Sequence, residues 1–131
     1  MEQNEKTKAL LAAFGCALAY LLAGKALAAV LPQVPEEAAR MWAFVHRCAA
    51  APIVEELVFR GIIQQLARPL GERQAVALQA VLFAVQHRGP AGMAYALVCG
   101  LMLGTLRSRT GSVWPGMLLH TLNNLLVFAA G

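Results

Sequence analysis

The stretch PIVEELVFRG at residues 52–61 places two adjacent glutamates and an arginine inside an otherwise apolar segment. The chain has 131 residues, of which 59% are hydrophobic, and its mean hydropathy is +0.58. Soluble domains are roughly 45–50% apolar, so the excess indicates a chain that lies in a lipid bilayer. An ionised carboxylate at the bilayer centre costs at least ~2.5 kcal/mol. Two of them side by side, Glu55 and Glu56, therefore indicate a functional site.

Apolar segments separated by short polar breaks predict an all-α fold, a polytopic membrane bundle of about five helices that forms one domain, residues 1–131. A first transmembrane helix is expected at residues 9–31. A secretory signal peptide is the alternative, because Lys6 and Lys8 precede the apolar run, but the run is longer than the usual ~7–15 residues. After a break at 32–37, the expected helices are 36–67 with a kink at Pro52, 72–87, 91–106, and a last one from Ser112, as N-cap, to the C-terminus.

Basic residues predict the orientation of these spans. Because the connections are short, successive helices are expected to cross the membrane in alternate directions. Six basic residues then fall on the same side as the N-terminus, which indicates that this side is cytoplasmic. They are Lys6, Lys8, Arg68, Arg73, Arg107 and Arg109. The net charge of +4 does not indicate nucleic-acid binding, since the basic residues are scattered. Small residues at Ala96, Gly100 and Gly104 predict a close approach of the fourth helix to a neighbour.

The spacing of the polar residues inside the expected spans indicates which of them share a helix face. Glu56 and Arg60 are four residues apart and are expected to form an ion pair. Glu55 is rotated by about 100° from Glu56 and is free to face another element. His120 and Asn124 share a face in the same way, as do Phe83 and His87.

A carboxylate, two histidines and an amide that converge in a bundle can activate a water and stabilise an oxyanion. The chemistry indicated is amide hydrolysis. The chain has no aspartate, which excludes a Ser-His-Asp triad, and it has no H-E-x-x-H zinc motif.

Three ordered motifs now resemble a known family. Glu55-Glu56-x-x-x-Arg60, Phe83-x-x-x-His87 and His120-x-x-x-Asn124 resemble the motifs of the CAAX protease and bacteriocin-processing (CPBP, or Abi) membrane proteases. The resemblance covers about residues 52–124, and residues 36–131 are expected to form a minimal core of this type. The chain is short for the family, so a second protomer is one way to complete the site.

The resemblance implies a role for each residue. Glu55, assisted by His87, would activate the water, and His120 with Asn124 would hold the oxyanion. Glu56, Arg60 and Phe83 would support the site. No cofactor is expected, and a metal-independent glutamate mechanism is favoured. A zinc-dependent version remains open, with Glu55, His87 and His120 as the ligands.

The function expected is an intramembrane endopeptidase of the bacterial inner membrane, acting on a membrane-associated protein or peptide. Two alternative functions are considered. One is a non-catalytic immunity or scaffold protein of the same fold. The other is a proton or ion carrier, since intramembrane Glu and His can form a relay. The substrate is not readable from the sequence, and homo-oligomerisation is left open.

Overall fold

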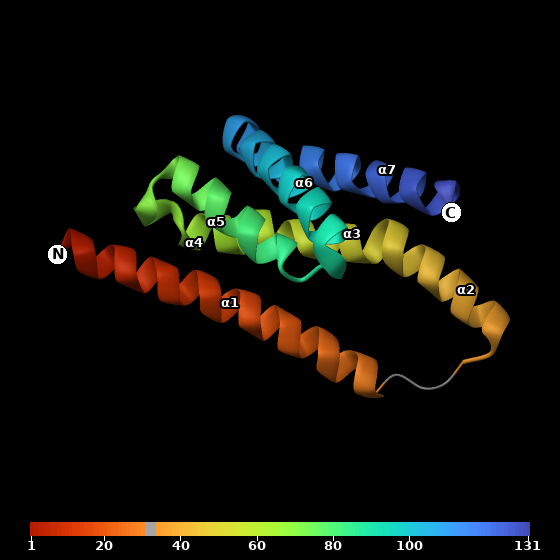
Figure 1. Cartoon of the computed structure of the whole chain (residues 1–131). Coiled ribbons are helices and arrows are strands. Elements are labelled where there is room, and N and C mark those ends of the chain that lie inside the picture. Colours follow the sequence, from red (N-terminus) through yellow and green to blue (C-terminus); the bar gives the residue numbers. More distant parts are fainter. Residues whose placement is uncertain (31–33) are drawn as a thin grey trace.

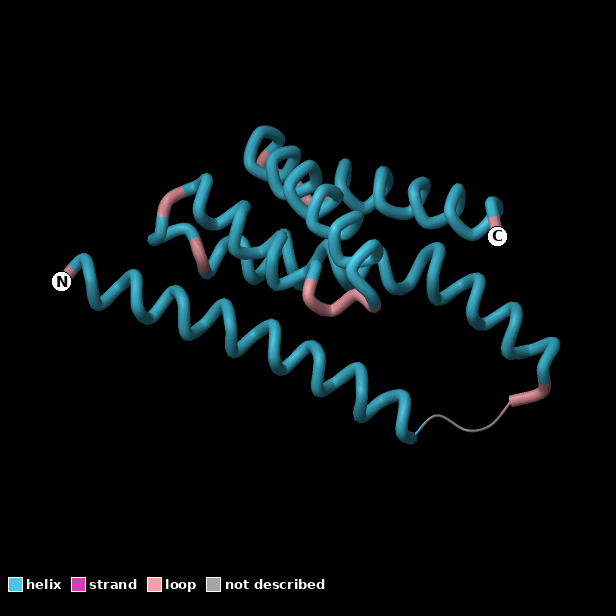
Figure 2. The backbone as a smooth tube through the Cα atoms, in the orientation of Figure 1, coloured by secondary structure: helices cyan, strands magenta, loops and turns pink. Residues whose placement is uncertain are grey.

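The computed structural model describes residues 1–30 and 34–131, and these residues form helices joined by short turns, with no strand among them (Figures 1 and 2). This confirms the all-α class. The elements are α1 (Glu2–Val30), α2 (Glu36–Val45), η1 (His46–Ala50), α3 (Ala51–Glu55), η2 (Glu56–Ile63), α4 (Gln64–Leu66), η3 (Arg68–Leu70), α5 (Glu72–Ala84), α6 (Gly89–Thr110) and α7 (Trp114–Ala130).

The segment from α2 to α4 is one continuous helical rod, as expected for residues 36–67, and it widens twice into π-helical turns. In η1, Ala51 N–H bonds to the carbonyl of His46, five residues back. This wider turn directly precedes Pro52, which lacks an N–H and would clash with the carbonyl four residues back. The second wide turn, η2, begins at Glu56. The expected irregularity at Pro52 is therefore a π-helical turn, and a second one begins at the paired glutamates.

The third expected helix is shorter than predicted. We expected it over residues 72–87, but α5 ends at Ala84, and His87 lies in the turn that follows. Thirteen residues span about 20 Å, less than the ~30 Å hydrocarbon core, so α5 is not a complete transmembrane span. The turn that carries His87 therefore follows directly after α5, and the ring of His87 packs against that of Phe83.

Other boundaries differ by a few residues. The first helix begins at Glu2 instead of residue 9, and its predicted last residue, 31, lies outside the described residues, as do 32 and 33 of the predicted break. The α6 helix extends the predicted 91–106 at both ends. The last helix starts at Trp114 with Val113 as its N-cap, although the hydroxyl of Ser112 accepts a hydrogen bond from Trp114 N–H.

The part of the rod from η1 to α4 lies at the centre of the bundle, whereas α2 extends to one side and has no buried residue (Figure 1). The α1 helix packs along η2, α4 and α5, and α7 packs on η1 and α3 (Figure 1). Ala13 and Ala17 of α1 are buried in the core with Phe59 and Phe83. The expected small-residue contact is confirmed, because a Cβ on Gly100 would lie 2.9 Å from the Cα of Ala80 on α5.

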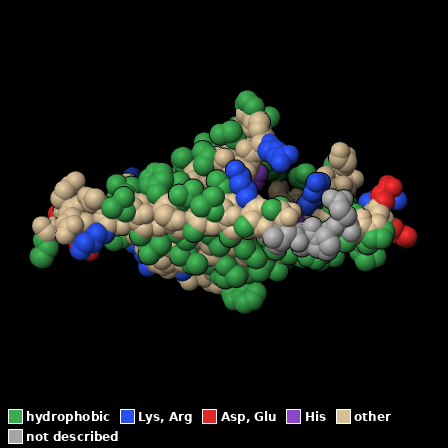
Figure 3. Space-filling model, turned by 90° about the horizontal axis from the view of Figure 1, so that it is seen from below, with side chains coloured by type: hydrophobic (Ala, Val, Ile, Leu, Met, Phe, Trp, Pro, Cys, Tyr) green, Lys and Arg blue, Asp and Glu red, His purple; other side chains and the backbone are tan. Residues whose placement is uncertain are grey.

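The outer surface is suited to lipid. Viewed from the side of α1, it is mostly hydrophobic (Figure 3). Within the part of the chain that the structure describes, two helices, α1 and α6, are long and apolar enough to cross a membrane, with mean hydropathies of 1.8 and 1.4 over their most apolar stretches. The polar residues of the predicted site lie on the rod, on α7 and in the turn after α5, and Glu56, Arg60 and His120 among them are buried.

Candidate active site

Glu56 and Arg60 are the most enclosed of the predicted site residues. Both side chains are fully buried, at 0% exposure. Arg60 Nη1 lies 3.2 Å from Glu56 Oε1. The N–H does not point at the oxygen, so the contact is an ion pair without an aligned hydrogen bond. The spacing of four residues along the rod thus produces the pair that the sequence predicts.

His120 brings the two glutamates together. Its Nδ1 lies 2.9 Å from Glu56 Oε1, and its Nε2 lies 3.5 Å from Glu55 Oε2. Glu55 and Glu56 leave the rod in different directions, but an imidazole has a nitrogen on each side of its ring and can reach both. Glu56 is therefore shared between Arg60 and His120, a contact that helical spacing within the rod does not reveal.

The four side chains form a row of alternating charge: Glu55, His120, Glu56 and Arg60. The row is neutral as a whole when His120 is an imidazolium, which reduces the cost of burying the charges. Glu55 stands at the outer end with 20% of its side chain exposed, whereas Glu56 and Arg60 are inaccessible. Of the two carboxylates, Glu55 is the one that a substrate or a water can reach.

Phe83 packs against both histidines and the arginine. Its ring centroid lies 4.7 Å from that of His87 and 5.8 Å from that of His120, both edge to face. The guanidinium carbon of Arg60 lies 4.4 Å from the same centroid, within cation–π distance. Phe83 thus joins the end of α5 to the rod and to α7.

His87 is oriented by the backbone of its own turn. Its Nδ1 lies 3.0 Å from the carbonyl oxygen of Phe83, so this nitrogen carries the proton and Nε2 is free to accept one. The ring is partly buried. Glu55 lies within Coulombic range of both His87 and His120.

Asn124 is held one helical turn beyond His120. Its Nδ2 donates to the carbonyl oxygen of Arg47, at 2.9 Å, and its Oδ1 accepts from Nδ2 of Asn123, at 3.3 Å. Tyr95 in turn donates to Oδ1 of Asn123. Because an amide NH₂ carries two hydrogens, one N–H of Asn124 is not used by these contacts.

Gly116 was not predicted as a site residue, yet it closes the space around Glu56. A Cβ at this position would lie 2.6 Å from Glu56 Oε2. Gly116, His120 and Asn124 recur every four residues along α7, and Glu56, Arg60 and Gln64 recur in the same way along the rod. This repeated spacing is the sequence signal that identifies Gly116 and Gln64 as neighbours of the site.

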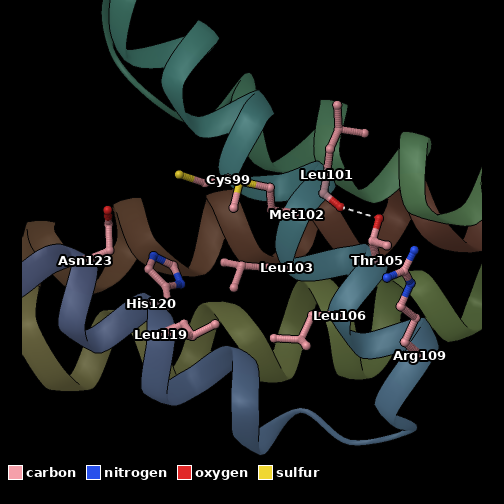
Figure 4. Close-up of a pocket in the computed structure, with 10 residues that line it drawn as sticks. All are labelled: Cys99, Leu101, Met102, Leu103, Thr105, Leu106, Arg109, Leu119, His120 and Asn123. Atoms are coloured by element: carbon pink, nitrogen blue, oxygen red, sulfur yellow. Dashed lines mark hydrogen bonds between the residues drawn. The ribbon is translucent and has the colours of Figure 1, made fainter.

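A cavity of about 660 Å³ lies between α6 and α7 (Figure 4). Its walls are mainly leucine and methionine side chains, and it reaches His120 and Asn123 at one end and Arg109 at the other. Glu55, His87 and Asn124 do not line it. The cavity therefore approaches the predicted site from the side of His120 only.

The predicted zinc ligands do not fit a metal as they are placed. Within residues 1–30 and 34–131, no three His, Cys, Asp or Glu side chains converge as a metal site. Both nitrogens of His120 are directed at the glutamates, and Nδ1 of His87 is bonded to the carbonyl oxygen of Phe83. We derive no step through a metal.

This arrangement, a helical membrane bundle with a buried carboxylate–histidine cluster, defines the class of the protein. A family model described as "Type II CAAX prenyl endopeptidase Rce1-like" matches residues 37–126, more than half of the chain, and the chain belongs to this family. No curated protein and no solved structure matches it. Family membership places the chain among the CAAX-type membrane proteases, which act on protein or peptide substrates at the membrane.

Proposed function

We propose that the chain is a metal-independent glutamate endopeptidase that hydrolyses a peptide bond of a membrane-associated protein or peptide. The observation that carries the proposal is the placement of His120 between the two glutamates, 2.9 Å from Glu56 and 3.5 Å from Glu55. Glu56 orients the imidazole, and Glu55 is the partly exposed carboxylate beside it. A base next to an oriented donor is what attack of water on an amide requires.

In the proposed reaction, the carboxylate of Glu55 takes a proton from a water molecule, and the oxygen of that water attacks the substrate carbonyl carbon. His87, whose Nε2 is free to accept a hydrogen bond, helps to position the water. The carbonyl oxygen becomes an oxyanion and receives hydrogen bonds from His120 Nε2–H and from the unused N–H of Asn124. Glu55 then returns its proton to the leaving amine as the carbon–nitrogen bond breaks.

The cavity between α6 and α7 is the proposed route of the substrate. It is apolar, as a segment arriving from the bilayer needs, and it ends at His120. Its 660 Å³ is within the ~300–1,000 Å³ typical of ligand sites. The proposed location is the inner membrane of a bacterium with the N-terminus in the cytoplasm, which puts Arg109 at the cytoplasmic end of the cavity.

The test compares the wild type with Glu55→Gln, His87→Ala and Asn124→Ala in proteoliposomes. The substrates are fluorogenic peptides that end in Cys-aliphatic-aliphatic-X, with and without a farnesyl group. New peptide termini in membranes of cells that express each form are mapped by mass spectrometry, so the result does not depend on these peptides alone. Each variant should lose cleavage at least about 10²-fold while it stays folded. Cleavage that survives Glu55→Gln, or the absence of any Glu55-dependent terminus, would overturn the proposal.

A further inference from the structure

Beyond Arg60, toward the start of α5, several buried polar atoms have no hydrogen-bond partner among the described residues. They are Nε and Nη2 of Arg60, Oε1 of Gln64 and Nε of Arg107, whereas Nη1 of Arg60 faces Glu56. Arg60 and Gln64 are 0% and 3% exposed, so bulk water does not reach them. Buried polar groups in folded proteins are almost always paired with protein atoms or with an ordered water. Their clustering therefore indicates a small polar ligand.

A small cavity lies beside these side chains. Arg60, Gln64 and Arg107 line it, together with residues that include Ser108 and Glu72, and its volume is about 10 Å³. A space of this size holds about one water molecule. The cavity is separate from the one between α6 and α7, because the two share no lining residue.

The chemistry of the lining selects the ligand. The unpartnered nitrogens of Arg60 and Arg107 can only donate hydrogen bonds, and Gln64 Oε1 can only accept them. A water molecule both accepts from the arginines and donates to the glutamine. A halide of similar size can accept but not donate, and it would face the oxygen of Gln64 unfavourably. We propose that the cavity binds a single water molecule bridging Arg60, Gln64 and Arg107.

This water joins two chains of contacts that otherwise stop short of each other. The first is the row Glu55, His120, Glu56 and Arg60 of the candidate active site. In the second, Gln64 Nε2 donates to Ser108 Oγ at 3.0 Å, and Ser108 donates to Glu72 at the surface. The gap between the chains lies between Arg60 and Gln64, where the cavity is. Gln64 is then a positioning residue that acts through the water on Arg60 and, through Glu56, on His120.

The direct test is a high-resolution structure of the full chain crystallised from a lipid phase. A single solvent peak within about 3.2 Å of Gln64 Oε1 and of a nitrogen of Arg60 is the expected result. Crystals grown in bromide distinguish the alternative, because a halide at this position gives an anomalous signal. An anomalous peak, or an empty cavity with the side chains paired directly, would overturn the proposal. None of these outcomes depends on the proposed protease activity.

A second measurement follows the effect on His120 and also needs no activity. Gln64→Met removes the acceptor oxygen, so Arg60 loses its bridge. The ring ¹⁵N signals of His120, which report the protonation of its two nitrogens, should shift in this variant. Gln74→Met changes an exposed glutamine of α5 and should leave the signals in place. An unchanged His120 spectrum in a folded Gln64→Met protein would remove the positioning role.

Discussion

His120 Nδ1 lies 2.9 Å from Glu56 Oε1, although 64 residues separate the two along the chain. This contact makes Glu56 more than the partner of Arg60. An imidazole that donates its Nδ1 proton to a buried carboxylate has a fixed orientation, and its other nitrogen then faces Glu55. The adjacent glutamates therefore lie against opposite sides of one ring, the fully buried Glu56 beside Nδ1 and the partly exposed Glu55 beside Nε2.

Glu56→Gln should be costly for both folding and activity. The substitution leaves the fully buried Arg60 without its counter-charge, which typically destabilises by about 3–5 kcal/mol. It also removes the acceptor that orients His120, so cleavage should fall roughly 10²-fold or more. Thermal unfolding in detergent and the cleavage assay measure the two effects. Glu37→Gln, at an exposed position of α2, is the control and should change neither.

Gly116→Ala should disturb the site through contact alone. The new methyl group would lie 2.6 Å from Glu56 Oε2, so the carboxylate or α7 must move. A displacement of about 1 Å at the reacting groups can cost roughly 10²-fold in rate. Gly92→Ala is the matched control, because its Cβ would meet nothing within 4 Å. Equal activity in the two variants would show that Gly116 is not required for close packing against Glu56.

Phe83→Leu should weaken the link between the end of α5 and the site. The ring contacts His87, His120 and Arg60, and its cation–π contact alone is expected to contribute up to about 2 kcal/mol in a desolvated position. We expect a lower unfolding temperature together with reduced cleavage. Phe14→Leu, on the exposed face of α1, should behave as the wild type. A wild-type unfolding temperature for Phe83→Leu would contradict this role.

Metal removal should leave cleavage unchanged. The described residues contain no converging set of three metal-binding side chains, and the proposed mechanism uses only side-chain groups. Treatment with EDTA and with 1,10-phenanthroline, followed by metal analysis of the purified protein, tests this. Loss of activity that added zinc restores would favour the zinc-dependent alternative.

The contact between α5 and α6 at Glu72 should fail in acid. The hydrogen bond from Ser108, with a smaller contribution from Arg68, holds the pKa of Glu72 below its ordinary value of 4.5. A carboxyl whose pKa is lowered in the folded state stabilises the fold above the pKa of the unfolded chain. This stabilisation is lost as the pH falls through the lower, folded pKa. The wild type should therefore unfold at a higher temperature than Glu72→Gln at pH 7, and the difference should shrink steadily as the pH is lowered below 4.5. A difference that does not change as the pH falls would show that ionisation of Glu72 does not carry the effect.

Much of the fold follows from local sequence. Apolar length predicts the helices, Pro69 and Gly71 end the rod, and Gly100 and Gly104 mark the packing of α5 on α6, because each depends on residues near one another in the chain. The end of α5 does not follow in this way. The spacing of Phe83 and His87 predicts a helix through residue 87, yet α5 ends at Ala84, where Phe83 packs against Phe59 of the rod and the ring of His87 packs against that of Phe83.

By itself the sequence determined the membrane character, the family motifs and the Glu56–Arg60 pair, since a pair four residues apart on one helix is a local property. Only the tertiary structure placed His120 between the two glutamates, Gly116 against Glu56 and a small polar cavity beside Arg60. These contacts join the rod to α5, α6 and α7, and their geometry depends on helix crossings that no single helix encodes. Residues 52–61 thus identified the two carboxylates, and the packing of α7 on the rod gave Glu55 and Glu56 different contacts.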